Sequence, residues 1–173
     1  MRVTTVFNKL LSLQGAFVRA VEFAVAATTL TVTVARRARR HQCPYCPFST
    51  LAGYDHHERY WDHVALGKWR VLLRATVYRL ECPRDGVVTE AVSWAAHGSR
   101  FTLDFEHLVA WLAREMNKTA VTRLMHIAWA TVGHIIERVV ERKLDPGRLE
   151  RLYVMGVDEV SYRKGHKYLN VVA

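Results

Sequence analysis

The chain has 173 residues, of which 50% are hydrophobic and 24% are charged. This composition excludes a disordered or collagen-like protein, and the length suits one ordinary domain or a few small modules. The 25 basic and 16 acidic side chains give a net charge of +9, which favours a polyanionic partner, most often nucleic acid. Three cysteines make a poor disulfide framework, so we expect a reducing, cytoplasmic compartment. No apolar run approaches the length of about 18 residues that a membrane span requires, so no membrane association is expected.

The first segment of the chain, residues 1–22, contains Asn8–Leu11 and a short apolar pattern around Phe17, Val18 and Val21. We expect one short helix there. The stretch that follows, from Glu22 to Val34, is rich in β-branched residues, and its apolar side chains alternate with threonines. A period of two predicts a strand.

A second β region is expected over residues 69–80, where apolar and basic side chains partly alternate. It runs into a Cys-Pro turn at Cys82, after which residues 87–89 again favour a strand. The stretch 47–68, between the two β regions, holds glycines and histidines and is predicted to be a loop.

The hydrophobic period becomes helical from residue 101 onward. Apolar side chains at i, i+3, i+4, i+7 and i+11, starting at Phe105, fall on one face of a helix, and Thr102 is suited to its N-cap. A second helical pattern covers residues 120–125, with Thr119 as a cap, and a third covers residues 132–140.

The cysteines have the spacing of a zinc site. Cys43 and Cys46 form a knuckle whose two thiolates can bind one tetrahedral Zn²⁺. Cys82 and Asp85 repeat the spacing at the second Cys-Pro turn, and a carboxylate oxygen can also bind zinc. These four residues are the predicted set, in which one of four histidines can replace Asp85: His41, His56, His57 or His63. Such a zinc would be structural, because four protein ligands leave no open position; the alternative is three buried cysteines without metal.

The paired helices in a basic chain suggest a helix-turn-helix that reads DNA. Residues 120–125 would form the supporting helix, residues 126–128 the turn, and residues 129–143 the recognition helix. We expect DNA contacts from four of its side chains: Trp129, Thr131, His134 and Arg138. The alternative is an ordinary helical hairpin packed for stability, which the absence of a glycine from the turn favours.

An arginine-rich run precedes the first cysteine knuckle and consists of Arg36, Arg37, Arg39 and Arg40. Four arginines in five positions cannot all be buried, so we expect the run to be exposed and to contact DNA phosphates. The alternative is a strand end that is merely solvated.

The last segment has features of a catalytic domain. An apolar strand is predicted over 153–157, with 168–172 as its hairpin partner. Asp158 comes at the end of this strand, where a carboxylate can hold Mg²⁺ for two-metal phosphoryl transfer. Such a site needs at least two further carboxylates, and the alternative is an aspartate that caps a turn.

Taken together, these features resemble the ISL-three class of bacterial insertion-sequence transposases. The resemblance rests on six stretches, of which the last is the most specific: Thr5–Leu11, Cys43–Cys46, Cys82–Val88, Ser99–Thr102, Trp129–Val140 and Gly156–Leu169. It implies a zinc ribbon, a helix-turn-helix, and an RNase-H-like domain with an Asp-Asp-Glu triad. By this resemblance Asp158 matches the first triad aspartate and would hold Mg²⁺, whereas relatives carry Cys or His at the position of Asp85.

We therefore expect an α+β chain of four segments. Residues 1–22 are an N-terminal segment and residues 23–97 a small zinc-ribbon-like β module. Residues 98–145 are a helical helix-turn-helix module, and residues 146–173 an incomplete β-hairpin that begins the RNase-H-like domain. Family members are longer, so the hypothesis is the N-terminal part of a truncated or frameshifted transposase, inactive by itself.

The expected partner is duplex DNA at the ends of the transposon. A homo-oligomer is left open, because an isolated hairpin has an unpaired edge. One alternative function is a self-standing DNA-binding regulator that competes with a full-length transposase. Another is a zinc-stabilised interaction module without a role on DNA.

Overall fold

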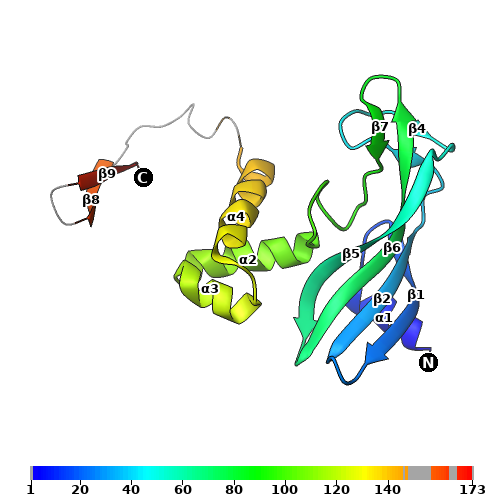
Figure 1. Ribbon diagram of the computed structural model, residues 1–173, viewed down its shortest axis with the longest axis horizontal. Coiled ribbons are helices and arrows are strands. Elements are labelled where there is room, and N and C mark those ends of the chain that lie inside the picture. The colour runs from blue at the N-terminus through cyan, green and yellow to red at the C-terminus, as the bar shows by residue number, and fades with distance from the viewer. Residues whose placement is uncertain (1, 146, 148–156, 164–166, 173) are drawn as a thin grey trace. The chain divides into compact units, whose positions relative to one another are not determined.

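The computed structural model describes residues 2–145, 147, 157–163 and 167–172; over the last two ranges we describe the backbone. These residues form four helices: α1 (Val3–Leu11), α2 (Leu103–Glu115), α3 (Lys118–Met125) and α4 (Trp129–Lys143) (Figure 1). They also form nine strands: β1 (Ala16–Ala24), β2 (Thr29–Arg36), β3 (His41–Gln42), β4 (Ser49–Thr50), β5 (Asp55–Leu66), β6 (Trp69–Cys82), β7 (Gly86–Thr89), β8 (Val157–Arg163) and β9 (Lys167–Val172). The predicted α+β class is confirmed. The chain divides into two compact units, residues 1–136 and 137–173.

The first unit is built on a mixed sheet with the strand order β1-β2-β6-β5, in which β7 also pairs with β6. The β1–β2, β5–β6 and β6–β7 pairs are antiparallel, whereas β2 and β6 run parallel. The parallel register joins Thr29–Thr33 to Arg70–Arg74 and stops there. Strand β6 continues to Cys82, and its C-terminal residues, 79–82, pair with β7.

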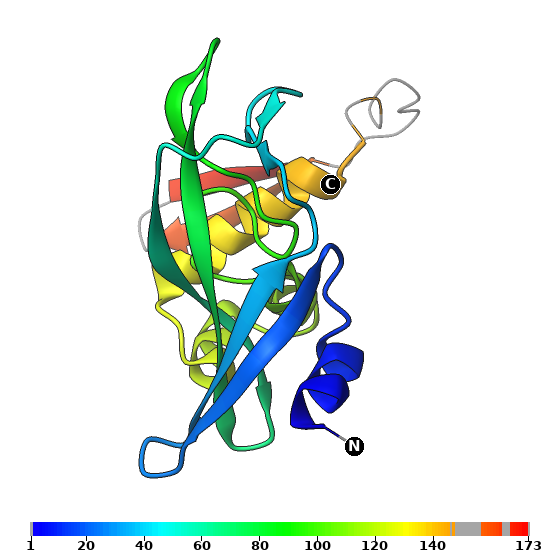
Figure 2. The same ribbon diagram turned by 90° about the vertical axis from the view of Figure 1, so that its right-hand side faces the viewer.

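One face of this sheet carries the hydrophobic core. Alternate side chains of β2 and β6 are buried on it, among them Leu30, Val32, Val71 and Leu73. Helix α1 lies alongside β1 (Figure 2) and adds side chains to the same core. Burial of each large apolar side chain contributes about 1.5–3 kcal/mol. The β module thus has a substantial core of its own, larger than the small zinc-dependent ribbon that we predicted.

The segment around Phe17 is a strand and not part of the short helix expected within residues 1–22. Ala16 and Val18 are buried while Phe17 is half-buried and Arg19 exposed, which is the period of two that strand pairing with β2 requires. The short helix expected within residues 1–22 is α1, which spans Val3–Leu11 and contains the Asn8–Leu11 stretch. Strand β1 crosses residues 22 and 23, where the sequence suggested the end of the first segment.

The stretch 47–68, predicted as a loop, is mostly strand β5. Trp61 and His63 point to its buried side, and Trp61 pairs with Leu73 of β6. The other positions of β5 are largely polar, so the local sequence lacks the apolar alternation of a strand. Pairing with β6 decides the conformation here, since tertiary context overrides weak strand propensity.

The helical part follows the predicted pattern closely. Thr102 caps α2, because its Oγ1 accepts from the Phe105 backbone N–H at 3.3 Å. Helix α3 begins earlier than expected, and its cap is Asn117 rather than Thr119. The Asn117 Oδ1 accepts from the Ala120 N–H at 2.8 Å. No helix in the described part of the chain is both long and apolar enough to span a membrane.

In the second unit, β8 and β9 pair as an antiparallel hairpin, and β9 contains the predicted partner strand 168–172. Most of the predicted strand 153–157 lies outside the described residues. Asp158 lies within β8, opposite Val171, rather than after the end of a strand.

Candidate functional site

Two turns bring the cysteines together at one end of the sheet. Cys43 and Cys46 lie between β3 and β4, and Cys82 and Asp85 lie where β6 turns into β7. The first turn is closed by the Cys43 backbone N–H, which donates to the Phe48 carbonyl at 2.9 Å. The second turn needs Gly86, whose φ of +70° is a conformation that other residues rarely adopt.

The four potential ligand atoms all lie within 4.8 Å of one another. The Asp85 Oδ2 is 3.3 Å from the Sγ of Cys43 and 3.3 Å from the Sγ of Cys82. The Sγ atoms of Cys46 and Cys82 are 3.5 Å apart. A tetrahedral zinc with Zn–S bonds of about 2.3 Å and a Zn–O bond of about 2.0–2.2 Å places its ligand atoms about 3.5–3.8 Å apart. These three distances lie close to those of a tetrahedral zinc site, so the four residues form a group that could hold a metal ion.

The histidines proposed as substitutes for Asp85 are placed elsewhere. His41 is buried, and its Nδ1 lies 2.9 Å from the Glu90 carboxylate. His63 is also buried, with its Nδ1 2.9 Å from the Thr102 hydroxyl. His56 and His57 lie on β5, and the cluster of potential ligands in the described residues includes neither.

In the metal-free cluster the thiols donate hydrogen bonds and the Asp85 carboxylate accepts them. A backbone hydrogen bond with Phe48 lowers the pKa of Cys46, but burial and the neighbouring Cys82, Asp85 and Cys43 raise it to about 12 overall. Hydrogen bonds from Cys46, Cys43 and Cys82 hold the pKa of Asp85 below its ordinary value. The carboxylate thus accepts from the thiols, and a zinc ion that replaced these protons would release them to solvent.

The helices α3 and α4 are joined by a tight turn. His126 adopts a left-handed φ of +53° at the end of α3, and its backbone N–H donates to the Thr122 carbonyl. His126 thereby takes the place of the glycine that commonly ends a helix in this way. Val121 of α3 and Val132 and Ile135 of α4 are fully buried and form the inner side of the pair. The arrangement has the supporting helix, turn and second helix of a helix-turn-helix.

The predicted DNA contacts line α4. Trp129, its first residue, is 61% exposed, and His134 is exposed one and a half turns later. Thr131 and Arg138 are half-buried. Lys118, which the sequence did not single out, lies with its Nζ 3.3 Å from the centre of the Trp129 ring. A helix that enters the major groove uses its N-terminal residues to reach base edges, and this half of α4 carries Trp129 and His134.

The arginine-rich run is divided between structural and exposed positions. Arg36 departs from the expected exposure, because its side chain is only 18% exposed and its Nη1 lies 3.0 Å from the Glu90 Oε2. Arg37, Arg39 and Arg40 are exposed. Arg40 donates to the Ser49 carbonyl at 2.6 Å, which holds the run beside β4.

Glu90 was missed in the sequence because its partners are distant. Its carboxylate is fully buried, and its Oε1 accepts from the Tyr78 backbone N–H at 2.9 Å. The Oε2 atom meets both Arg36 and His41. These contacts join β2, β3 and β6, so they hold the start of the arginine-rich run against the sheet.

Comparison with known proteins identifies the helical part. Residues 90–140 match the helix-turn-helix domain of transposase family ISL3. The chain is therefore related to the ISL3 family of insertion-sequence transposases. The predicted family resemblance is confirmed, and the ISL3 match covers α3, the turn and α4 as far as Val140.

The chain is also similar to two transposases for insertion sequence element IS1557, from Mycobacterium tuberculosis strains CDC 1551 / Oshkosh and ATCC 25618 / H37Rv. Each is 44% identical over 117 residues, which is 66% of this chain. The match covers 26% of each relative, so the chain spans about a quarter of the length of these curated relatives. No solved structure matches the chain.

Proposed function

We propose that this chain is the DNA-binding N-terminal part of an insertion-sequence transposase and that it binds duplex DNA at the ends of the element. The observation that carries the proposal is the α3–turn–α4 pair, which the ISL3 match covers as far as Val140, with Trp129 and His134 exposed on the N-terminal half of α4. In this role the protein works on DNA in the bacterial cytoplasm.

In the proposed complex, α4 enters the major groove. The positive end of its dipole and the Lys118 ammonium favour approach to the phosphates. Thr131 and His134 are then the side chains that meet base edges, and Trp129 packs beside them. Arg138 follows His134 by one helical turn, so it lies on the same side of α4 and contacts the phosphate backbone of the DNA.

The three exposed arginines Arg37, Arg39 and Arg40 add phosphate contacts outside the groove. Their position depends on the structure around them, since Arg40 bonds to Ser49 of β4. In the proposal a structural zinc binds Cys43, Cys46, Cys82 and Asp85. That zinc would join the β3–β4 and β6–β7 turns and so fix the loop that carries these arginines.

Asp158 is proposed as one metal-binding carboxylate of the RNase-H-like domain of a whole transposase. This assignment comes from the family resemblance, and Mg²⁺ would supply the charge that a phosphoryl transfer needs. Two-metal sites need several carboxylates, so Asp158 would act together with further acidic residues. In a whole transposase Asp158→Ala should abolish strand transfer, and activity that survives the substitution would contradict the assignment.

The proposed function is tested by the affinity for a duplex that carries the end of the element, against a duplex of scrambled sequence. We expect tighter binding to the end duplex and a steep loss of affinity with salt. His134→Ala should lower the preference for the end sequence, because base contacts carry specificity. Equal affinity for the two duplexes would contradict specific end binding, and binding without salt dependence would point to the interaction module.

The competing function, a self-standing regulator, is separated by a mixture of this chain with a full-length transposase. A regulator that occupies the element ends lowers transposition in proportion to its concentration. If the chain binds the same ends but transposition by the full-length protein stays unchanged, the result favours the first proposal, a transposase part.

A further inference from the structure

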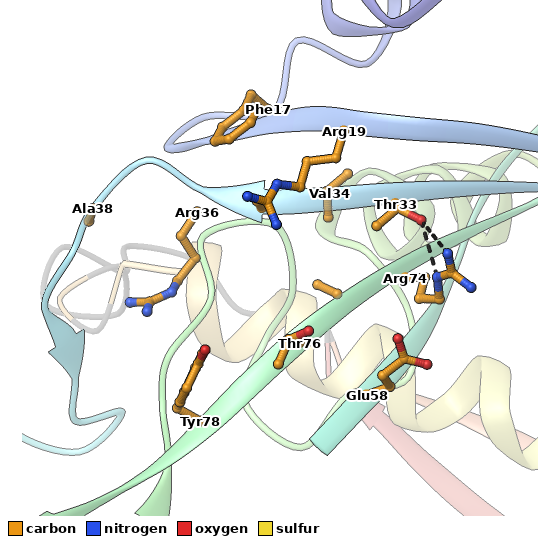
Figure 3. A pocket seen from close by; sticks show the side chains of 12 residues that line it. Phe17, Arg19, Thr33, Val34, Arg36, Ala38, Glu58, Arg74, Thr76 and Tyr78 are labelled. Atoms are coloured by element: carbon orange, nitrogen blue, oxygen red, sulfur yellow. Dashed lines mark hydrogen bonds between the residues drawn. The ribbon is translucent and has the colours of Figure 1, made fainter. Parts of the chain in front are cut away.

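The open face of the sheet has a hollow where β2 separates from β6. Their parallel pairing ends at Thr33 and Arg74, and beyond that point β2 continues toward Arg36. A hollow of about 240 Å³ opens in this gap, with Val34 and Ala75 among the residues that line it (Figure 3). The hollow lies outside the α3–turn–α4 pair.

Arg19 lies at a bulge of β1 that borders this hollow. Val18 pairs with Val34 and Ala20 pairs with Thr33, so Arg19 is an extra residue between two paired positions. A bulge redirects the side chain of its extra residue. Arg19 is exposed and lines the hollow, as Figure 3 shows. Within the described part of the chain its guanidinium has no carboxylate partner, so its charge is available to a ligand.

The other two arginines of the hollow are fixed in place by carboxylates that do not line it. Arg36 is paired with Glu90 at 3.0 Å, and Arg74 with Glu22 at 2.9 Å. Arg74 also donates twice to the Thr33 hydroxyl, at 2.9 and 3.1 Å. These pairings hold both guanidinium groups at the walls before any ligand arrives, which lowers the entropic cost of binding.

The polar lining suits an anion that accepts several hydrogen bonds. Thr76 and Tyr78 of β6 offer hydroxyl groups on the wall opposite Arg19 (Figure 3). Guanidinium groups bind phosphate oxygens in a fork geometry, which makes arginine the preferred residue for phosphate recognition. Glu58, an exposed carboxylate of β5, is the one acidic side chain among the described lining residues.

We propose that this hollow binds a phosphate of the DNA backbone, with Arg19 as the residue that contacts it. The hollow is called the Arg19 site below. The inference rests on the proposed function and adds a second contact, on the sheet rather than on α4. Arg36 and Ala38 line the Arg19 site, so it is continuous with the exposed arginines of the 36–40 run. A DNA strand that follows those arginines would pass onto the open face of the sheet.

The test compares Arg19→Gln with Lys9→Gln. Both substitutions remove one exposed positive charge, but Lys9 lies on α1, which covers the other face of the sheet. Binding of a scrambled duplex is measured by fluorescence anisotropy over a range of salt concentrations. Each lost phosphate contact should lower the slope of log K against log salt by about 0.9. We expect this loss for Arg19→Gln, with a Kd raised about threefold, and little change for Lys9→Gln.

Glu58→Gln should change the affinity for DNA in the direction opposite to Arg19→Gln. Removal of the carboxylate beside the Arg19 site should tighten binding of the same duplex, because like charges repel a phosphate there. Equal slopes for Arg19→Gln and Lys9→Gln, with wild-type binding intact, would overturn the Arg19 site and leave the proposed function standing. Failure of the wild-type protein to bind any duplex would instead overturn the proposed function and, with it, the DNA contact.

Arginine Nε–Hε signals distinguish DNA phosphate from free phosphate as the ligand. In a spectrum of the wild-type protein we expect a signal absent from Arg19→Gln to shift on addition of the duplex. Inorganic phosphate at the same phosphate concentration should shift it less, because the duplex adds the neighbouring contacts. A larger shift with inorganic phosphate would overturn the assignment to DNA.

Discussion

The ammonium group of Lys118 lies 3.3 Å from the centre of the Trp129 ring, so the first residue of α3 covers the first residue of α4. The same Nζ lies close to Gly133, where an added Cβ would come within 3.0 Å of it. One face of the Trp129 ring is therefore occupied by protein. Base stacking on that face is excluded while Lys118 stays in place, so Trp129 positions the start of α4 as well as facing solvent.

Lys118→Met should weaken the α3–α4 pair. A cation over an exposed aromatic ring contributes about 0.5–1 kcal/mol, so we expect a loss of this size in the free energy of unfolding. Lys118→Arg keeps the interaction and should stay near wild type. Chemical denaturation followed by far-ultraviolet circular dichroism measures both, and an equal loss for the two variants would contradict a role for the cation over the ring.

Zinc should be bound at one ion per chain after dialysis and should be lost on Cys82→Ser, as measured by elemental mass spectrometry. Chelation is expected to loosen the two cysteine turns and to leave the sheet folded. The reason is that the buried cluster around Cys43 and Cys82 is separate from the main core. Far-ultraviolet circular dichroism after chelation checks this, and global unfolding would show that the core depends on the metal.

Asp85→Cys offers the positive control for the metal site. A thiolate in the fourth position should bind zinc more tightly than the carboxylate, because zinc favours sulfur ligands in structural sites. Competition with a chromogenic chelator gives the affinity. An unchanged affinity in Asp85→Cys would show that Asp85 is not the fourth ligand.

Glu90→Gln should be the most damaging of the substitutions discussed here. It leaves Arg36 and His41 without the buried carboxylate that both contact, and breaking a buried ion pair costs about 3–5 kcal/mol. Urea denaturation measures the loss. Arg39→Gln, at an exposed position of the same run, should stay within about 0.5 kcal/mol of wild type. A midpoint for Glu90→Gln that equals wild type would contradict this account.

His63 should make stability depend on pH. Burial lowers the pKa of His63, and the charge of Asp104 opposes this only in part. The folded protein then binds fewer protons than the unfolded chain, so the free energy of unfolding should fall as pH drops below about 6.5. His63→Gln, which can keep a bond to Thr102, should reduce that fall, whereas His126→Gln at an exposed position should not. The same pH dependence in His63→Gln and wild type would assign the effect to other groups.

The sequence was informative where structure is local. The helical periods predicted α2 and the bounds of α4, and the two Cys-Pro turns predicted that Asp85 lies with the cysteines. Strand β5 could not be predicted, because its polar stretch becomes a strand only by pairing with β6. The buried Glu90 was missed for the same reason, since its partner Arg36 lies more than fifty residues earlier in the chain. Neither feature has a local pattern that would mark it.

The bulge at Arg19 is a further case of long-range control. Nothing in the apolar pattern around Phe17 indicates that one residue of β1 is unpaired. The register is set by β2, whose Thr33 and Val34 take successive partners on either side of Arg19. The bulge beside the proposed phosphate contact is therefore set by strand pairing, whereas the proposed contacts on α4 could be read from the helical period.

Footprinting of the element's end with the purified protein tests the central claim most directly. If α4 reads the DNA, a continuous stretch of about one helical turn should be protected inside the terminal sequence. His134→Ala should lose this footprint at protein concentrations where Lys9→Gln keeps it. Protection spread evenly over the whole fragment, or an unchanged footprint in His134→Ala, would contradict the account of α4 as the helix that reads the DNA.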